Sequence, residues 1–244
     1  MKGSGIMATF VLVHGSFGGG WVWKKVTPLL RAGGNDVYIP RLTGLSDRSH
    51  LLDCGVDLTT HITDVASLLF YEDLSDVVLV GHSYAGMVIT GVAANVPERL
   101  KLLVYLDAYV PSDGQNEFDL WPAEERAAAQ ADMVAGKGLR QPPPPAVLGI
   151  TDPEMADWAY ARFTPHPLAT YNQPVPVGGA KSAALPRVFI RCTAGPLTPR
   201  FAPFGARASA AGWEVHELAT GHMAMLTAPR DVAELLLRVA VARG

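Results

Sequence analysis

Short apolar runs alternate with segments of helical periodicity along most of the chain. Six runs rich in β-branched residues predict strands, and four of them are almost continuously apolar, which is typical of parallel strands covered on both faces. These runs span residues 9–13, 36–39, 77–80, 102–106, 187–191 and 213–218. Apolar positions at helical spacing predict helices at 21–31, 58–70, 84–95 and 230–241. The alternation predicts a doubly wound α/β sheet of about six mainly parallel strands, without a leading hairpin.

The alternation stops between Pro111 and Leu185. This stretch contains an alanine-rich segment at 123–133 and a helical pattern at 154–163. Between them lie four consecutive prolines, at 142–145, which predict a stiff extended connector. We expect residues 112–185 to form a mostly helical cap, inserted into an α/β core made of residues 7–111 and 186–244. Residues 1–6 are interpreted as a leader or cloning remnant ahead of a natural start at Met7.

Composition narrows the classes of protein that fit. With 49% hydrophobic and 18% charged residues in 244, the chain can bury a sizeable core and disorder is not expected. The net charge of −3 and the lack of a Lys/Arg cluster argue against nucleic acid as a partner. The apolar runs are too short for a membrane span, so we expect no membrane partner. Cys54 and Cys192 allow at most one disulfide, which favours reduced thiols and the cytoplasm.

A candidate nucleophile follows the third predicted strand. The sequence Gly81-His82-Ser83-Tyr84-Ala85-Gly86 lies between a buried strand and a helix. This is the context of a G-x-S-x-G elbow, in which small flanking residues allow a sharp turn that exposes the serine Oγ above the sheet edge. Ala85 stands where the pattern has glycine, a mild departure. The pattern alone also fits an ordinary turn, but its position favours Ser83 as a catalytic nucleophile.

A glycine-rich turn follows the first predicted strand. His14-Gly15-Ser16-Phe17-Gly18-Gly19-Gly20 does not match the dinucleotide pattern G-x-G-x-x-G from any starting point. A plain glycine-rich connector is one interpretation. The other is an oxyanion hole, in which the backbone N–H groups of Ser16 and Tyr84 stabilise negative charge on a reacting carbonyl oxygen.

The base that a serine nucleophile needs is predicted to be His222. Such elbows are followed in the chain by an acid and then a histidine, and His222 lies in the loop between the last predicted strand and the C-terminal helix. The other histidines flank motifs or lack the spacing of metal ligands, so we expect no metal site.

With these motifs, the chain resembles the α/β-hydrolase superfamily, and within it the branch of plant methylesterases, hydroxynitrile lyases and bacterial pyrethroid hydrolase-like carboxylesterases. The resemblance implies cofactor-free ester hydrolysis through an acyl-serine, with Ser83, His222 and the N–H groups of Ser16 and Tyr84 matching the family's motifs. It extends over residues 10–24, 40–45, 71–74, 80–90, 105–114 and 221–226.

One departure concerns the acid. The family places it after the fifth strand, usually as C-T-x-D, but this chain reads Cys192-Thr193-Ala194-Gly195 there and has no carboxylate from 192 to 212. Either the acid is missing or another strand end supplies it. Asp107, directly after the fourth strand, is the geometric substitute, and we hypothesise that it accepts a hydrogen bond from His222. The alternative is that Asp107 only caps a turn.

The resemblance also separates related chemistries. Hydroxynitrile lyases of this branch have Thr after the strand-end histidine and Lys after the catalytic one, where this chain has Gly15 and Met223. That difference favours hydrolysis of small to medium hydrophobic esters, with a homodimer left open. A lactonase, cyclase or lyase, or a binding protein on the same scaffold, remain the alternatives. Aromatic residues predicted to line the substrate pocket are Phe17, Tyr84, Phe118, Trp121, Trp158 and Phe163.

Overall fold

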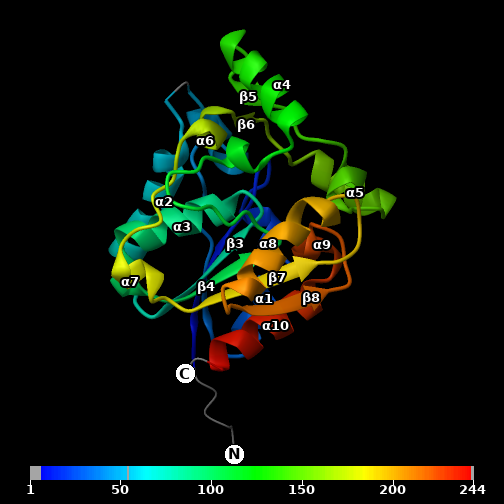
Figure 1. Cartoon of the computed structure of the whole chain (residues 1–244). Helices are drawn as coiled ribbons and strands as arrows, with labels where there is room; N and C mark the ends of the chain where they lie inside the picture. Colours follow the sequence, from blue (N-terminus) through cyan, green and yellow to red (C-terminus); the bar gives the residue numbers. More distant parts are fainter. Residues whose placement is uncertain (1–6, 54, 243–244) are drawn as a thin grey trace, which may run out of the picture.

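The computed structural model describes residues 7–53 and 55–242, and in this part of the chain six parallel strands form one sheet (Figure 1). The strand order is β2-β1-β3-β4-β7-β8, with every neighbouring pair parallel. This confirms the predicted doubly wound α/β sheet. The interpretation of residues 1–6 as a leader and the thiol of Cys54 lie outside the described residues. The strands are β1 (Thr9–Val13), β2 (Asp36–Tyr38), β3 (Val77–His82), β4 (Leu100–Leu106), β7 (Arg187–Cys192) and β8 (Glu214–Leu218).

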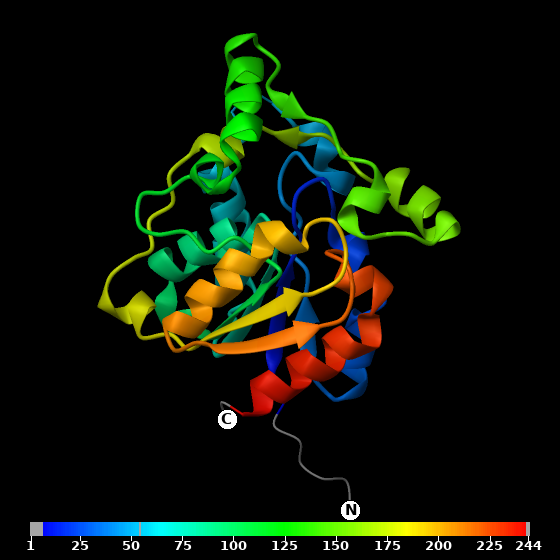
Figure 2. The same cartoon turned by 45° about the vertical axis from the view of Figure 1, so that its right-hand side comes forward.

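Helices cover both faces of the sheet (Figure 2). Because side chains alternate along a strand, Val11 and Leu79 pack into the core on one face, whereas Leu12 and Val80 pack into the core on the other. The first core is covered by α2 (Leu58–Tyr71), α3 (Ala85–Asn95) and α8 (Thr198–Ala210). The second is covered by α1 (Thr27–Ala32), α9 (Ala224–Thr227) and α10 (Pro229–Val241).

Local signals explain where several helices begin. The Asp57 side chain accepts from the Thr60 N–H while the Thr60 hydroxyl bonds back to the Asp57 N–H, a capping box that starts α2. The helix predicted over 21–31 is divided into a 3-10 turn, η1 (Gly20–Trp23), and α1. Pro28 lies in the first turn of α1, where its missing N–H costs nothing, and it cannot extend a helix begun upstream.

Helix α8 has no counterpart among the predicted helices. Pro203 and Gly205 lie inside the helix and weaken its helical propensity, whereas Pro199 lies in the first turn, where proline is tolerated. Phe201, Phe204 and Ala208 nevertheless share one buried face of α8 against the sheet. Tertiary burial therefore outweighs local propensity here.

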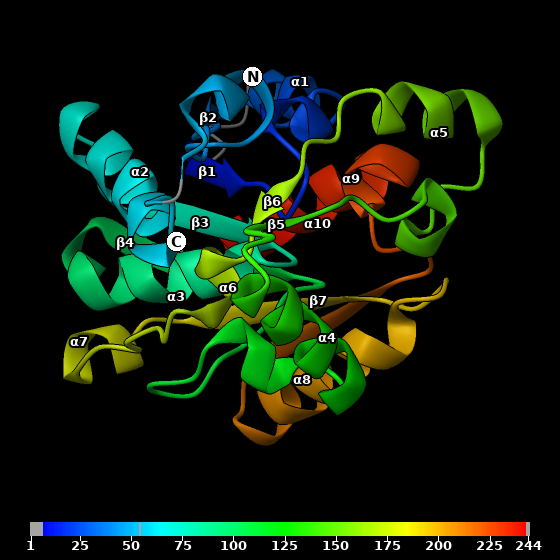
Figure 3. The same ribbon diagram turned by 90° about the horizontal axis from the view of Figure 1, so that it is seen from above.

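The segment between β4 and β7 rises over the carboxyl ends of the strands (Figures 1 and 3). Its α4 and α5 confirm the helical patterns predicted there, whereas β5 and β6 pair as an antiparallel ladder that was not predicted. Pro144 is extended, as expected for the proline run, and Pro145 begins a 3-10 turn. The later helices lie against the core, α6 on α2 and α7 on η3. The division into core and cap remains a prediction. The elements are η4 (Glu117–Leu120), α4 (Ala123–Val134), β5 (Leu139–Arg140), η5 (Pro145–Leu148), α5 (Pro153–Tyr160), β6 (His166–Pro167), α6 (Ala169–Asn172) and α7 (Ala180–Ala183), with η2 (Ser46–Leu51) and η3 (Pro97–Arg99) in the core.

No helix within the described residues has the length and apolar character needed to cross a bilayer. The cytoplasmic location stays a prediction.

Replacing the exposed Pro203 by alanine tests whether this proline destabilises α8. Alanine restores a backbone donor and removes the clash of the proline ring with the preceding turn. We therefore expect Pro203→Ala to raise the free energy of unfolding by about 1–2 kcal/mol. Chemical denaturation monitored by circular dichroism measures the change. A less stable variant would show that Pro203 contributes more by restricting the unfolded chain than it costs the helix.

Candidate active site

Ser83 occupies a strained turn at the end of β3. Its φ is 57°, in the left-handed region, and its N–H donates to the Leu106 carbonyl at 3.3 Å. The following helix packs so closely that a Cβ on Gly86 would lie 2.0 Å from the Tyr109 carbonyl oxygen. The small residue after the elbow is therefore required by packing. This is the geometry of a nucleophile elbow, with Ser83 at the wall of a cavity.

His222 and Asp107 are in direct contact. The His222 Nδ1 lies 2.7 Å from the Asp107 Oδ2, and the two side chains are only 4% and 1% exposed. They come from positions 115 residues apart, in the loops that follow β8 and β4. A carboxylate at this distance fixes the ring orientation and places the proton on Nδ1, which leaves Nε2 free to accept one.

The backbone at the ends of β4 and β7 holds the Asp107 carboxylate. Asp107 has φ 44°, its N–H donates to the Ile190 carbonyl at 2.7 Å, and its Oδ1 accepts from the Cys192 N–H at 3.1 Å. Because β4 and β7 are neighbours, Asp107 lies beside the segment after Cys192, where the resembling family carries its acid. The carboxylate therefore has a hydrogen-bond partner on each oxygen.

Two rings, those of Phe201 and His82, pack against the imidazole of His222. The Phe201 ring of α8 stacks on it with centroids 4.7 Å apart and planes at 11°. On another side lies His82, whose Nε2 donates to the His222 carbonyl at 2.9 Å. Burial keeps the pKa of His82 well below its usual value, so the ring beside His222 is neutral.

The loop that bears His222 is packed against the inserted segment. Gly221 and Gly149 approach so closely that a Cβ on Gly221 would lie 2.8 Å from the Gly149 Cα. The Met223 N–H also donates to the Leu148 carbonyl at 3.2 Å. The inserted segment thus helps to hold the histidine loop in place.

The glycine-rich turn after β1 packs directly on Ser83. A Cβ on Gly15 would lie 2.9 Å from the Ser83 Cβ, so only glycine fits. The Tyr171 hydroxyl donates to the Ser16 Oγ at 2.8 Å, and the Thr164 N–H donates to the Phe17 carbonyl at 3.0 Å. These contacts fix the turn from the side of the inserted segment.

Neutral histidines lie behind this turn. Burial lowers the pKa of both His14 and His61 to about 4. The His61 Nε2 lies 2.9 Å from the Thr43 carbonyl and must donate to it, so Nδ1 accepts from the Tyr84 hydroxyl at 2.8 Å. The Tyr84 side chain is therefore committed to the core rather than to a substrate pocket.

A cavity of about 610 Å³ lies beside Ser83 and His222, a size that suits a small ligand. Phe17 lines it as predicted, together with Ser16 and His82. The other aromatic residues predicted to line the pocket are not among its lining residues, because each is used in packing.

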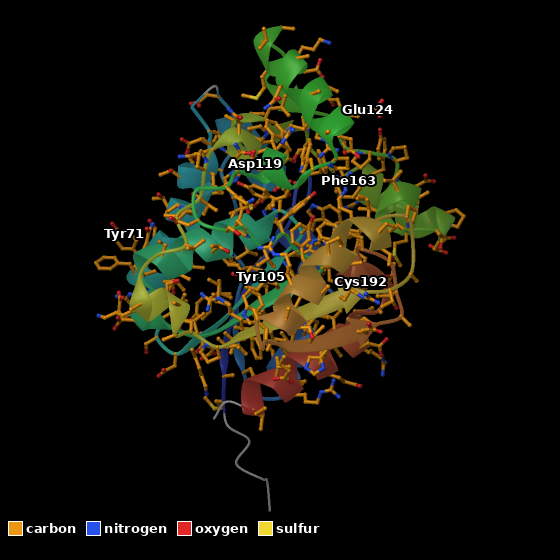
Figure 4. All side chains as sticks on the ribbon, viewed as in Figure 1. Tyr71, Tyr105, Asp119, Glu124, Phe163 and Cys192 are labelled. Atoms are coloured by element: carbon orange, nitrogen blue, oxygen red, sulfur yellow. The ribbon has the colours of Figure 1, made fainter. Side chains whose placement is uncertain are left out.

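Those aromatic residues belong to two clusters of packed rings. Phe118 is fully buried and packs against Trp121, which also contacts Tyr171. Trp158 and Phe163 pack around Trp21, with ring centroids 5.2 and 5.5 Å from it. Figure 4 shows Phe163 beside α5, apart from Glu124 on α4 and Cys192 at the end of β7.

The cavity has polar groups that the sequence motifs did not indicate. Glu117, Glu125, Arg140 and Arg200 all line it. No spacing rule connects them, because they come from η4, α4, β5 and α8. Within residues 7–53 and 55–242, no group of three His, Cys, Asp or Glu side chains is arranged to hold a metal ion.

The chain is similar to known hydrolases over most of its length. Residues 10–235 match the model of the alpha/beta hydrolase family. A carbendazim hydrolyzing esterase from Nocardioides sp. is 38% identical over 94% of this chain and 98% of its own length. Methylesterase 10 of Arabidopsis thaliana is 27% identical over 95% and 91%. An extracellular alpha/beta-hydrolase from a Paenibacillus species superposes with a TM-score of 0.80 and is 27% identical, over 95% of this chain and 98% of that one.

The contact between Gly15 and Ser83 predicts that Gly15→Ala impairs turnover. The new methyl group must displace either the Ser83 side chain or the turn that contains Ser16, and a displacement of about 1 Å at reacting atoms can cost roughly a hundredfold in rate. Steady-state hydrolysis of para-nitrophenyl acetate measures the loss. Gly179→Ala is a matched control, since its φ of −95° suits alanine and nothing lies within 4 Å of the corresponding position. Unchanged turnover in Gly15→Ala would contradict the contact.

Proposed function

Because the chain belongs to the alpha/beta hydrolase family, we propose that this carboxylic ester hydrolase cleaves small to medium hydrophobic esters through an acyl-serine intermediate. The observation that supports the mechanism best is the 2.7 Å contact between His222 Nδ1 and Asp107 Oδ2 at the cavity that Ser83 lines. It supplies a base and its orienting acid beside a serine held in an elbow.

In the first half of the reaction, His222 Nε2 takes the proton of the Ser83 hydroxyl while Ser83 Oγ attacks the ester carbonyl. The Asp107 carboxylate stabilises the imidazolium that forms. When the tetrahedral intermediate collapses, the bond to the alcohol oxygen breaks and His222 gives its proton to that oxygen. The products of this half are the free alcohol and an acyl-Ser83.

The second half repeats the cycle with water. His222 removes a proton from the water as it attacks the acyl carbon, and the proton then returns to Ser83 Oγ as the carboxylic acid leaves. Both halves develop negative charge on the carbonyl oxygen. We assign its stabilisation to the backbone N–H groups of Ser16 and Tyr84, a role supported by the packing of the glycine-rich turn on Ser83.

The cavity supports a hydrophobic substrate of modest size. Phe17, Val147, Leu148, Leu197 and Met223 contribute apolar wall near the reacting groups. The Phe17 ring in that wall supports esters with an aromatic part. Aryl esters such as nitrophenyl acetate or butyrate are suitable test substrates.

The nucleophile is tested by covalent labelling. A fluorophosphonate probe should label the wild-type protein, because its phosphorus is attacked as the ester carbonyl is, and Ser83→Ala should not be labelled. In-gel fluorescence with intact-protein mass spectrometry reads both. Ser209→Ala changes another serine, in the last turn of α8, and should keep full labelling. No labelling of the wild type between about pH 6 and 9 would refute the acyl-serine mechanism.

The acid is tested by Asp107→Asn. The amide keeps an oxygen for the Cys192 N–H but presents N–H to His222, which forces the wrong tautomer, so we expect turnover to fall by about 10³–10⁴. Circular dichroism and thermal unfolding control for folding. Turnover close to wild type in a folded variant would remove Asp107 from the mechanism.

A further inference from the structure

Glu117 is a buried carboxyl group at the wall of the cavity. It begins η4, where a capping box between Asn116 and Asp119 fixes the backbone, and it is only 2% exposed. Its Oε1 accepts a hydrogen bond from the Trp121 indole N–H at 3.0 Å. Its Oε2 has no hydrogen-bond partner among the described residues. An unsatisfied buried polar atom beside a substrate cavity calls for a partner from outside the chain.

The nearby arginines are engaged by a different carboxylate. Glu125 pairs through Oε1 with Arg200 and lies 3.6 Å through Oε2 from Arg140. Arg200 also approaches the Tyr109 hydroxyl at 3.4 Å. The Arg140 guanidinium lies over the Trp121 ring, 4.2 Å from its centre. Glu125 therefore forms the ion pairs with both arginines of this wall, and Glu117 forms no ion pair within the described residues.

This environment keeps Glu117 protonated at neutral pH. Burial raises its pKa to about 8, against the smaller opposing effects of the Trp121 hydrogen bond, Arg140 and Arg200. Tyr109 and Tyr171 also face this region, and burial raises the pKa of both, so they stay neutral. With Oε1 accepting from Trp121, the Glu117 proton resides on Oε2, which then acts as a donor.

We propose that Glu117 determines substrate specificity by donating a hydrogen bond from Oε2 to an acceptor atom on the ester, such as a ring nitrogen or a second carbonyl oxygen. The proposal rests on the proposed esterase function and defines its substrate class. Preferred substrates are hydrophobic esters that carry an acceptor away from the scissile bond. Esters without one leave the donor buried and unpaired, which lowers their transition-state binding.

Isosteric ester pairs test the inference. Para-nitrophenyl phenylpropanoate is compared with its three isomeric pyridyl analogues, which exchange a ring C–H for nitrogen and keep the leaving group. Phenylpropyl acetate and its pyridyl analogues place the nitrogen on the alcohol side, with acid release followed by titration. The measured quantity is the ratio of kcat/KM for a pyridyl ester to that for its phenyl partner.

Two variants separate donation from other roles of Glu117. Glu117→Gln retains both an acceptor for Trp121 and a donor, so it should keep the wild-type preference for at least one pyridyl isomer. Glu117→Met removes the donor at similar length, and that preference should fall about tenfold, the order expected for one buried hydrogen bond. Each variant is its own reference through the phenyl ester, so a general loss of activity does not affect the ratio.

The pH dependence gives an independent reading. A donor present below the raised pKa disappears as pH rises through about 8, so the wild-type preference should decline between about pH 7 and 9.5. In Glu117→Gln it should stay constant, because the amide does not titrate. The other titratable groups that face Glu117 are Arg140, Arg200, Tyr109 and Tyr171, with Glu125 paired to the two arginines.

The outcomes are distinguishable. The inference would be overturned if the pyridyl-to-phenyl ratio of kcat/KM were the same in wild type and Glu117→Met for every isomer on both sides of the ester. The esterase function would still stand if wild type hydrolysed the phenyl esters and Ser83→Ala did not. Loss of the preference in Glu117→Gln would also overturn the inference, by showing that a neutral donor at this position is not what selects the pyridyl ester. If Glu117→Met does not fold, the Gln variant and the pH profile still decide.

Discussion

The Asp107 carboxylate lies almost wholly out of solvent, between the imidazole of His222 at 2.7 Å and the N–H of Cys192 at 3.1 Å. Burying a carboxylate is costly unless its oxygens are hydrogen-bonded, and here each oxygen has a partner. The two bonds join the end of β4 to the end of β7 and to the loop after β8. The orientation of His222, and with it the access of Nε2 to the cavity, depends on this one buried group.

The inserted segment does more than cover the sheet edge. Tyr171 holds Ser16 through its hydroxyl, and Gly149 packs against Gly221 beside His222. Both loops that flank Ser83 are thus fixed partly by residues of the insertion. The same segment supplies Glu117 and Arg140 to the cavity wall. One segment therefore contacts both loops beside Ser83 and also lines the cavity.

Helix α8 and two of the predicted pocket residues show where burial, rather than local sequence, decided the structure. Helix α8 contains prolines and a glycine, yet it forms because Phe201 and Phe204 are buried on one face. Trp158 and Phe163 were predicted to line the pocket because they are large and aromatic, but they pack with Trp21. Composition cannot distinguish an aromatic ring in a core from one in a cavity, since both environments favour the same residue types.

The sequence by itself determined the parallel sheet, the elbow at Ser83 and the loop position of His222, because strand periodicity and strand–turn–helix motifs are encoded in neighbouring residues. It also left two interpretations for the acid, a missing one or Asp107, because no carboxylate stands between residues 192 and 212. The tertiary structure decided that Asp107 meets His222, that Phe201 stacks on that ring, and that Glu117, at the cavity wall, keeps one buried oxygen without a partner among the described residues. These contacts join residues far apart in the chain, and their distances follow from how strands and insertion pack rather than from any local pattern.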